Sequence, residues 1–365
     1  MEARDNNFDE LRLLAALLVL FSHSFALTGQ GRSEPIRRLL HGAANGGSLA
    51  VAAFFTISGF LVARSAGRRG LDGFLAARAL RIWPALAFAV VLQALLLGPF
   101  VTRMPLAAYF ADPGSWEFLR NALIFDLRPG LPHVFDSNPF PAAVNGSLWT
   151  LPVESAAYLL LPVVVLLGGL RRFWVLFWLA LGLVAWAGVR LGGYSWHSQG
   201  PFLLWSVPMY PALDLLVYFL AGAALWVHRD DVPLSLGLFL AGLLLMFAAL
   251  GTLAAPFVLH LVLPYGVLFL ALWRPVCLPG LAALGDLSYG TYLWAFPIQQ
   301  SVVFLLAPAV SPWLVMLCAA PPTLAMAWLS ARLVERPALR LKVASRSPGL
   351  GGIIIPFEKL LTRRG

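Results

Sequence analysis

Long apolar segments recur along the whole chain and constrain its fold more than any other feature. Each is about 18–22 residues long, enough to cross a hydrocarbon layer of roughly 30 Å as an α-helix. Of the 365 residues, 60% are hydrophobic and 12% are charged, whereas an ordinary soluble domain carries about 25% charged residues. The sequence therefore predicts an all-α polytopic membrane protein.

The apolar windows predict a bundle of about ten transmembrane helices. Their expected first residues are Leu11, Leu49, Arg81, Leu148, Phe173, Pro208, Leu234, Pro256, Leu287 and Pro312. We expect one membrane domain over residues 1–342 and a short cytoplasmic tail over residues 343–365. The first segment contains Arg12 and His23, and no small-residue cleavage site follows it. We therefore interpret it as a retained span and not as a signal peptide.

The basic residues indicate the orientation. The formal net charge is +9, but the basic residues lie between apolar segments and form no patch of the kind that binds nucleic acid. Short cytoplasmic loops are enriched in Lys and Arg. With a cytoplasmic N-terminus, the basic short loops fall on that side, and Arg32, Arg37 and Arg38 are the main exception. We therefore expect a multi-pass protein of the inner membrane with both termini in the cytoplasm.

One connection is long and not apolar. Residues 102–145 are rich in Pro and aromatic residues and are expected to form an ordered outer loop between spans three and four. The two cysteines, Cys277 and Cys318, have neither metal-ligand spacing nor a disulfide pattern. No metal and no obligate protein partner is expected, and the lipid bilayer is the main environment.

Arg12 and His23 are ionisable residues inside the first span, where insertion costs about 2.5–3.5 kcal/mol and function is the default explanation. His23 follows Arg12 by eleven positions, so both project from one helix face, roughly 16 Å apart along the axis. A guanidinium near the cytoplasmic entrance suits phosphate, and an imidazole in the outer half suits proton transfer. The alternatives are an arginine that extends to the interface and a histidine that packs against a neighbouring helix.

Glu154 enters span four at nearly the depth of His23. A carboxylate at that depth needs a partner, and His23 is the imidazole at a matching height. A Glu154–His23 pair would fix the tautomer of the imidazole and raise its basicity. The alternative is a glutamate bound to a backbone or loop group.

Two further clusters carry candidate functions. Arg78 and Arg81 are three residues apart and share a helix face at the cytoplasmic start of span three. They suit anionic groups of a ligand, or they serve only to anchor the span. In span two, the small residues Ser58 and Gly59 allow close approach of a second backbone or of a slender ligand arm, and ordinary helix packing explains them equally.

Six motifs in this order resemble the membrane-bound acyltransferase 3 family of bacterial O-acyltransferases, over nearly the whole chain. They are Asn7-Phe8-Asp9 with Arg12 and His23, Phe54 to Leu61, Arg78 to Pro84, Asn145 to Glu154, Leu287 to Trp294, and Glu335-Arg336-Pro337. The resemblance implies a ten-helix bundle, a cytoplasmic acyl-CoA donor and a carbohydrate hydroxyl of an envelope or exported glycan as acceptor. Ala295 and Ser155 depart from the family pattern, where many members carry a histidine and a second glutamate, so no role is expected of these two residues.

The resemblance also assigns roles to the candidate residues, with acetyl-CoA as the expected donor. His23 and Glu154 are the expected catalytic residues. The expected donor-binding residues are Arg12, Arg78, Arg81 and Ser58, and the expected acceptor-binding residues are Asn145, Ser147, Trp149 and Tyr292. Direct transfer and transfer through Ser22 or His23 as a nucleophile both remain open. A competing hypothesis is a proton-coupled transporter or exporter of a glycan or small solute, with His23 and Glu154 as the proton relay.

Overall fold

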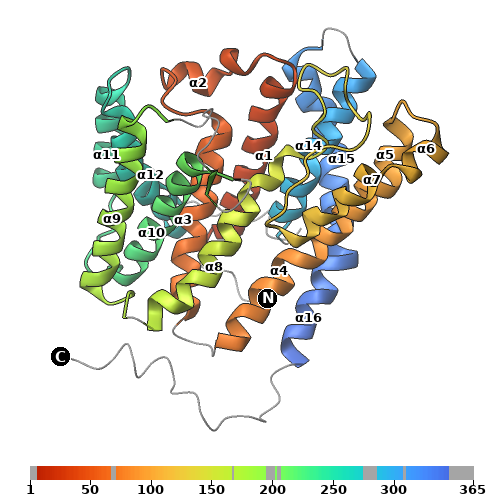
Figure 1. The fold of residues 1–365 in the computed structure, drawn as a ribbon. Helices are drawn as coiled ribbons and strands as arrows, with labels where there is room; N and C mark the ends of the chain where they lie inside the picture. Colours follow the sequence, from red (N-terminus) through yellow and green to blue (C-terminus); the bar gives the residue numbers. More distant parts are fainter. Residues whose placement is uncertain are drawn as a thin grey trace.

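Long helices lie side by side in one bundle in a computed structural model of the protein (Figure 1). The structure describes residues 6–66, 71–166, 168–194, 202–203, 207–273, 286–306 and 310–344. The main helices are α1 (Phe8–Leu27), α3 (Gly46–Ala66), α4 (Leu71–Leu92), α8 (Leu151–Leu166), α9 (Arg172–Leu191), α10 (Met209–Val227), α11 (Leu236–Ala249), α12 (Ala255–Leu272), α14 (Ser288–Leu306) and α15 (Pro312–Ser330). In this part of the chain, eight segments are long and apolar enough to cross a membrane, and α11 and α14 are not among them. The predicted helical bundle is therefore confirmed for the described residues, with eight helical segments that could span a membrane and the further helices α11 and α14.

Shorter elements connect or extend these helices. They are η1 (Gly31–Ser33), α2 (Pro35–Leu39), η2 (Gln93–Leu97), α5 (Gly98–Val101), α6 (Leu106–Ala111), α7 (Pro113–Glu117), η3 (Phe118–Leu123), η4 (Gly146–Thr150), β1 (Phe202–Leu203), β2 (Val207–Pro208), η5 (Ala331–Glu335) and α16 (Arg336–Ala344). The strands β1 and β2 pair antiparallel over two residues each, a small exception to the predicted all-α fold.

Two segments are longer than a single span requires. The helix that was expected to begin at Arg81 begins at Leu71 and runs through the π-helical turn η2 as a 30-residue segment, Asp72–Val101. The last segment, Pro312–Leu341, likewise has 30 residues and passes through the π-helical turn η5. The apolar window missed the start of α4 because Arg78 and Arg81 interrupt it. Both arginines line an internal cavity, so the helix extends past them.

Helices α3 and α10 touch backbone to backbone at the centre of the bundle. A Cβ atom on Gly59 would lie 1.9 Å from the carbonyl oxygen of Phe219, and a Cβ on Gly222 would lie 2.1 Å from that of Thr56. Because only glycine permits such an approach, each helix supplies one glycine to the contact. The predicted close approach at Gly59 is therefore an approach of a second backbone and not of a ligand arm. This contact fixes the position of the neighbouring Ser58.

The long connection between α4 and α8 is ordered by contacts with the bundle. It forms α6, α7 and η3, and α6 and α7 lie in the same upper half of the view as α2 (Figure 1). Asn138 Nδ2 donates to the backbone oxygen of Gln300 on α14 at 3.0 Å, and Tyr109 donates to that of Ala94 at 2.7 Å. The side of the membrane on which this connection lies stays a prediction. The predicted cytoplasmic tail over residues 343–365 lies outside the described residues from residue 345 onward, as does Cys277, whereas Cys318 is a free and exposed thiol.

Candidate functional site

Among the described residues, two neighbouring cavities of the bundle share Val51 and Tyr292 in their linings. The smaller one, of about 270 Å³, is called the arginine cavity here. Its polar lining residues are Arg12, Ser58, Arg78, Arg81, Thr150, Glu154, Tyr158, Asp286, Ser288, Tyr289 and Tyr292. The larger one, of about 620 Å³, is called the histidine cavity and contains His23 in its wall. The shared residues make the two cavities neighbours.

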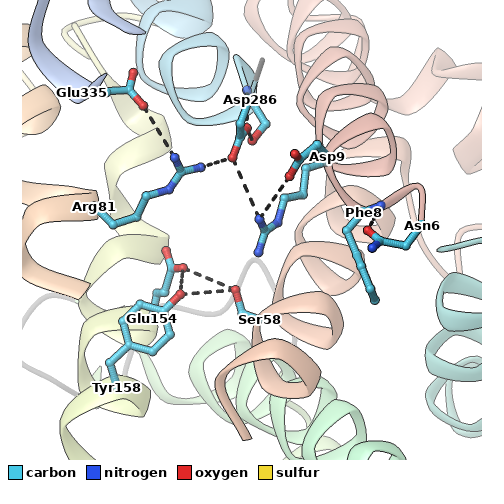
Figure 2. A network of polar contacts seen from close by, with 11 residues as sticks. Asn6, Phe8, Asp9, Ser58, Arg81, Glu154, Tyr158, Asp286 and Glu335 are labelled. Atoms are coloured by element: carbon cyan, nitrogen blue, oxygen red, sulfur yellow. Dashed lines mark hydrogen bonds and ion pairs between the residues drawn. The ribbon is translucent and has the colours of Figure 1, made fainter. Parts of the chain in front are cut away.

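Arg81 is held between two carboxylates in the arginine cavity (Figure 2). Its guanidinium donates a hydrogen bond to Asp286 Oδ2 and lies 3.8 Å from Glu335 Oε2. Glu335 belongs to η5 and is only 4% exposed. The acidic motif near the end of the chain therefore supports the second arginine of α4.

Asp286 also binds the first helix. Its Oδ2 lies 3.9 Å from Arg12 Nη1, and its Oδ1 accepts the backbone N–H of Ser288 at 3.1 Å. Burial alone would raise the pKa of Asp286, but the two guanidinium groups of Arg81 and Arg12 outweigh burial and hold that pKa below its ordinary range. An ionised Asp286 thus joins α1, α4 and the start of α14.

Arg78 differs from Arg81 because no described carboxylate forms an ion pair with it. Its Nε atom is buried and has no hydrogen-bond partner among the described residues. Its guanidinium lies 5.4 Å from the ring centroid of Tyr158 and 5.8 Å from that of Phe74. Aromatic faces hold the cation in place and leave its charge available to an anion in the cavity.

Glu154 faces the arginine cavity and is bound by two hydroxyl groups (Figure 2). Tyr158 donates a hydrogen bond to Glu154 Oε1, and Ser58 Oγ lies 3.5 Å from the same oxygen and 3.3 Å from the Tyr158 hydroxyl. Among the described residues, no hydrogen bond joins Glu154 to His23. The structure therefore does not show the direct pair of these two side chains that the sequence predicts. Glu154 reaches a tyrosine one turn along its own helix, and both residues line the arginine cavity.

His23 lies in the wall of the histidine cavity. Phe296 of α14 meets the imidazole edge to face, with ring centroids 5.3 Å apart. The Nδ1 atom is buried and has no hydrogen-bond partner among the described residues. Packing against an aromatic ring therefore sets the orientation of this histidine. Trp149 and Tyr292, two of the predicted acceptor residues, line the same cavity.

Asn145 and Ser147 line neither cavity. Asn145 is 2% exposed, and its Nδ2 donates to the backbone oxygen of Leu293 at 3.0 Å. The backbone oxygen of Ser147 accepts the hydroxyl of Tyr292 at 2.7 Å. These contacts link the segment that precedes α8 to α14. The structure does not bring Asn145 and Ser147 to the predicted acceptor site.

Sequence reasoning gave no site role to several polar residues of the two cavities. Among them are Tyr158 and Asp286 in the arginine cavity, and Asp214 and His260 in the wall of the histidine cavity. Glu335, which the sequence offered only as part of a family motif, contacts Arg81. A signal existed for Asp214 and His260, because both are ionisable residues inside apolar segments. Within the described residues, no three His, Cys, Asp or Glu side chains lie close enough together to hold a metal ion.

Comparisons with known proteins give a consistent result. Residues 5–332 match the model of the acyltransferase domain. The chain is 32% identical to a protein of Shigella phage Sf6 named O-acetyl transferase, over 91% of this chain and 96% of the relative. It is 30% identical to nodulation protein 10 of Rhizobium leguminosarum bv. viciae, over 93% of this chain and 94% of the relative. No solved structure matches the chain.

Proposed function

The chain belongs to the family of membrane acyltransferases defined by that domain, and on this premise we propose that it transfers an acetyl group from acetyl-CoA to a hydroxyl group of an envelope or exported glycan. The acetyl group is supported by the relative named O-acetyl transferase, which aligns over nearly its full length. The glycan acceptor is supported by the histidine cavity, whose aromatic and polar lining suits a sugar ring.

The arginine cavity is the proposed donor site. Its volume of about 270 Å³ is below the roughly 300–1,000 Å³ of pockets that enclose a drug-sized ligand. It therefore suits the slender pantetheine arm of CoA, while the nucleotide stays outside. Arg78, whose guanidinium has no described acidic partner, supplies positive charge for a phosphate group, and Arg12 and Arg81 add to it.

His23 is the proposed general base. The acetyl thioester passes from the arginine cavity toward the histidine cavity, past Tyr292, which lines both. The acceptor oxygen attacks the thioester carbonyl and His23 takes its proton. The bond between carbon and sulfur then breaks, and the proton passes to the sulfur as CoA leaves. Two substrates that arrive from different cavities thus meet at one imidazole.

Glu154 acts in this proposal as a positioning residue. Its hydrogen bonds to Tyr158 and Ser58 hold two hydroxyl groups in the wall of the donor cavity. Trp149 lines the histidine cavity together with His23 and offers an aromatic surface to the acceptor sugar.

The single observation that carries the proposal is the adjacency of a cavity that contains arginines and a cavity that contains a histidine, in a chain of this family. The test compares a deletion strain with the same strain carrying the wild-type chain, by acetate released from the envelope glycan with mild alkali. The wild-type chain should restore glycan-bound acetate, and the purified protein in lipid nanodiscs should release CoA when acetyl-CoA and the deacetylated glycan are supplied together. Equal acetate in both strains and no CoA release would reject the proposed function.

A further inference from the structure

A second buried histidine, His260, lines the histidine cavity together with Asp214. His260 lies on α12 and Asp214 on α10, and their side chains are 4% and 9% exposed. The Nε2 atom of His260 is 3.2 Å from Asp214 Oδ1. Neither residue belongs to the proposed reaction centre, yet burial of an ionisable pair within an apolar bundle is costly and calls for a function.

The imidazole of His260 is fixed in orientation. Its Nδ1 lies 2.8 Å from the backbone oxygen of Pro256, and because a carbonyl oxygen only accepts, Nδ1 carries the hydrogen. Tyr218 stacks on the ring with centroids 4.4 Å apart, and Trp186 lies 4.1 Å away. The ring therefore cannot turn, and Nε2 is the atom left to act on a ligand.

The contact between His260 and Asp214 is incomplete. Although the two atoms lie within ion-pair distance, Nε2 is buried and makes no hydrogen bond among the described residues. An unpaired polar atom in such a site is costly, and the pair borders a cavity of about 620 Å³. A ligand hydroxyl is suited to this site, because a hydroxyl both donates and accepts and can hydrogen-bond the carboxylate of Asp214 and Nε2 of His260.

We propose that Asp214 and His260 form an acceptor subsite that binds one hydroxyl of a sugar while a different hydroxyl of the same sugar is presented to His23. This inference rests on the proposed function. His23 and the Asp214–His260 pair line one cavity, so a sugar with two free hydroxyl groups can engage both. The pair then selects which hydroxyl is acetylated and takes no part in the chemical step.

The test separates acceptor binding from donor binding. The full-length chain and the variants Asp214→Asn and His260→Gln are purified in nanodiscs. Acetyl-CoA binding is measured by calorimetry, and transfer is titrated with the deacetylated envelope polysaccharide of the deletion strain. We expect KM for the polysaccharide to rise about tenfold or more, as for loss of a hydrogen bond to a charged group, with acetyl-CoA affinity unchanged.

A matched control is available in the chain. His228 Nδ1 lies 3.2 Å from Asp231 Oδ2 in a second pair, which lines neither of the two cavities. The variants His228→Gln and Asp231→Asn should leave KM for the polysaccharide unchanged. The double variant Asp214→Asn/His260→Gln should lose no more than the worse single variant, because both atoms hold the same hydroxyl.

Three results would overturn the subsite. They are an unchanged KM in both single variants, a parallel loss of acetyl-CoA binding, and fully additive losses in the double variant. If one variant is lost during purification, the other tests the same prediction, since each replaces one half of the pair. Failure of the wild-type chain to acetylate the polysaccharide at all is a different result. It rejects the proposed function, and the acceptor subsite with it.

Discussion

The hydroxyl of Tyr158 donates a hydrogen bond to Oε1 of Glu154, one turn earlier on α8. Ser58 on α3 lies within reach of both groups, and the ring of Tyr158 also lies against Arg78. One tyrosine therefore connects the carboxylate, the serine and the unpaired arginine of the arginine cavity. In the proposed function, this arrangement makes the Tyr158 hydroxyl a positioning group for the donor.

Tyr158→Phe should weaken donor binding. The substitution keeps the ring under Arg78 but removes the hydrogen bond to Glu154, and a hydrogen bond to a charged group contributes about 1.5–3 kcal/mol. We expect the KM for acetyl-CoA to rise about tenfold with little change in KM for the acceptor. Steady-state kinetics with each substrate varied in turn measures this. An equal rise in both KM values would indicate general damage and contradict the positioning role.

His23→Ala should abolish transfer while acetyl-CoA still binds. General acid–base catalysis contributes about 10²–10⁴-fold in rate, and His23 is the proposed base. Calorimetry with acetyl-CoA and CoA release in the presence of acceptor give the two readouts. His41, which is exposed, provides the control variant His41→Ala, which should retain full activity. Substantial transfer by His23→Ala would remove His23 from the mechanism.

Arg78→Ala should raise the Kd of acetyl-CoA about tenfold or more, because charge-assisted contacts to phosphate are strong in a partly buried site. Arg78→Lys keeps the charge and should show a smaller loss. Binding should also depend less on ionic strength in the alanine variant. Arg64, exposed at the end of α3 and absent from the cavity lining, gives the matched control Arg64→Ala. Equal effects of Arg64→Ala and Arg78→Ala would show that only bulk charge matters.

Asp286→Asn should lower stability, since it leaves the Arg81 guanidinium with Glu335 alone. Breaking a fully buried pair from one side costs about 3–5 kcal/mol, and because the Arg81–Asp286 pair is partly buried, we expect a smaller loss. The double variant Arg81→Gln/Asp286→Asn should recover part of that loss, and thermal unfolding in detergent measures it. The exposed pair of Arg172 and Asp231 is the control, where Asp231→Asn should cost about 0–1 kcal/mol.

The depressed pKa of Asp286 also sets how this stabilisation depends on pH. A carboxyl whose folded-state pKa lies below its unfolded value stabilises the fold above the unfolded pKa, and the contribution is lost as pH falls through the folded pKa. Acidification from about pH 8 to about pH 5 should therefore leave the Asp286 contribution intact.

Gly59→Ala should prevent assembly of the bundle. The added Cβ would lie 1.9 Å from the Phe219 carbonyl oxygen, and backbone atoms cannot move aside as a flexible side chain can. We expect loss of the monodisperse protein in size-exclusion chromatography. Gly188 on α9 has nothing within 4 Å of an added Cβ, so Gly188→Ala should be neutral or stabilising by about 1 kcal/mol. A well-folded Gly59→Ala protein would mean that α3 and α10 are further apart than the structure places them.

Sequence patterns predicted the helices well because the cost of exposing backbone polar groups to lipid forces each apolar segment into a helix. The predicted first residue of α4 was wrong because a hydropathy scale counts Arg78 and Arg81 as polar, even though their side chains line an internal cavity. Asp286, the partner of Arg81, lies more than two hundred residues away in sequence, and no local pattern connects the two residues. Helical spacing put Arg12 and His23 on one face, but it did not reveal that they line two cavities.

The partner of Glu154 was beyond local reasoning for a different reason. Depth alone suggested His23, whereas the side chain is bound by Tyr158 on its own helix. The rotation of α8 about its axis decides whether Glu154 meets His23 or Tyr158. The depth of a residue in the membrane gives no information about that rotation. Asp214 and His260 were accessible to the rule that buried ionisable residues are functional. The predicted catalytic residues lie in the first and fourth spans, whereas Asp214 lies on α10 and His260 on α12.

The backbone contact of α3 with α10 has a consequence for how substrates move. Carriers that alternate between two open states rock one group of helices against another, and such rocking requires helices near the midplane to slide. Gly59 and Gly222 each seat against a carbonyl of the opposite helix, which leaves no room for sliding at that crossing. In the proposed function, the crossing of α3 and α10 therefore stays fixed, and the acyl group and the sugar move to a stationary site.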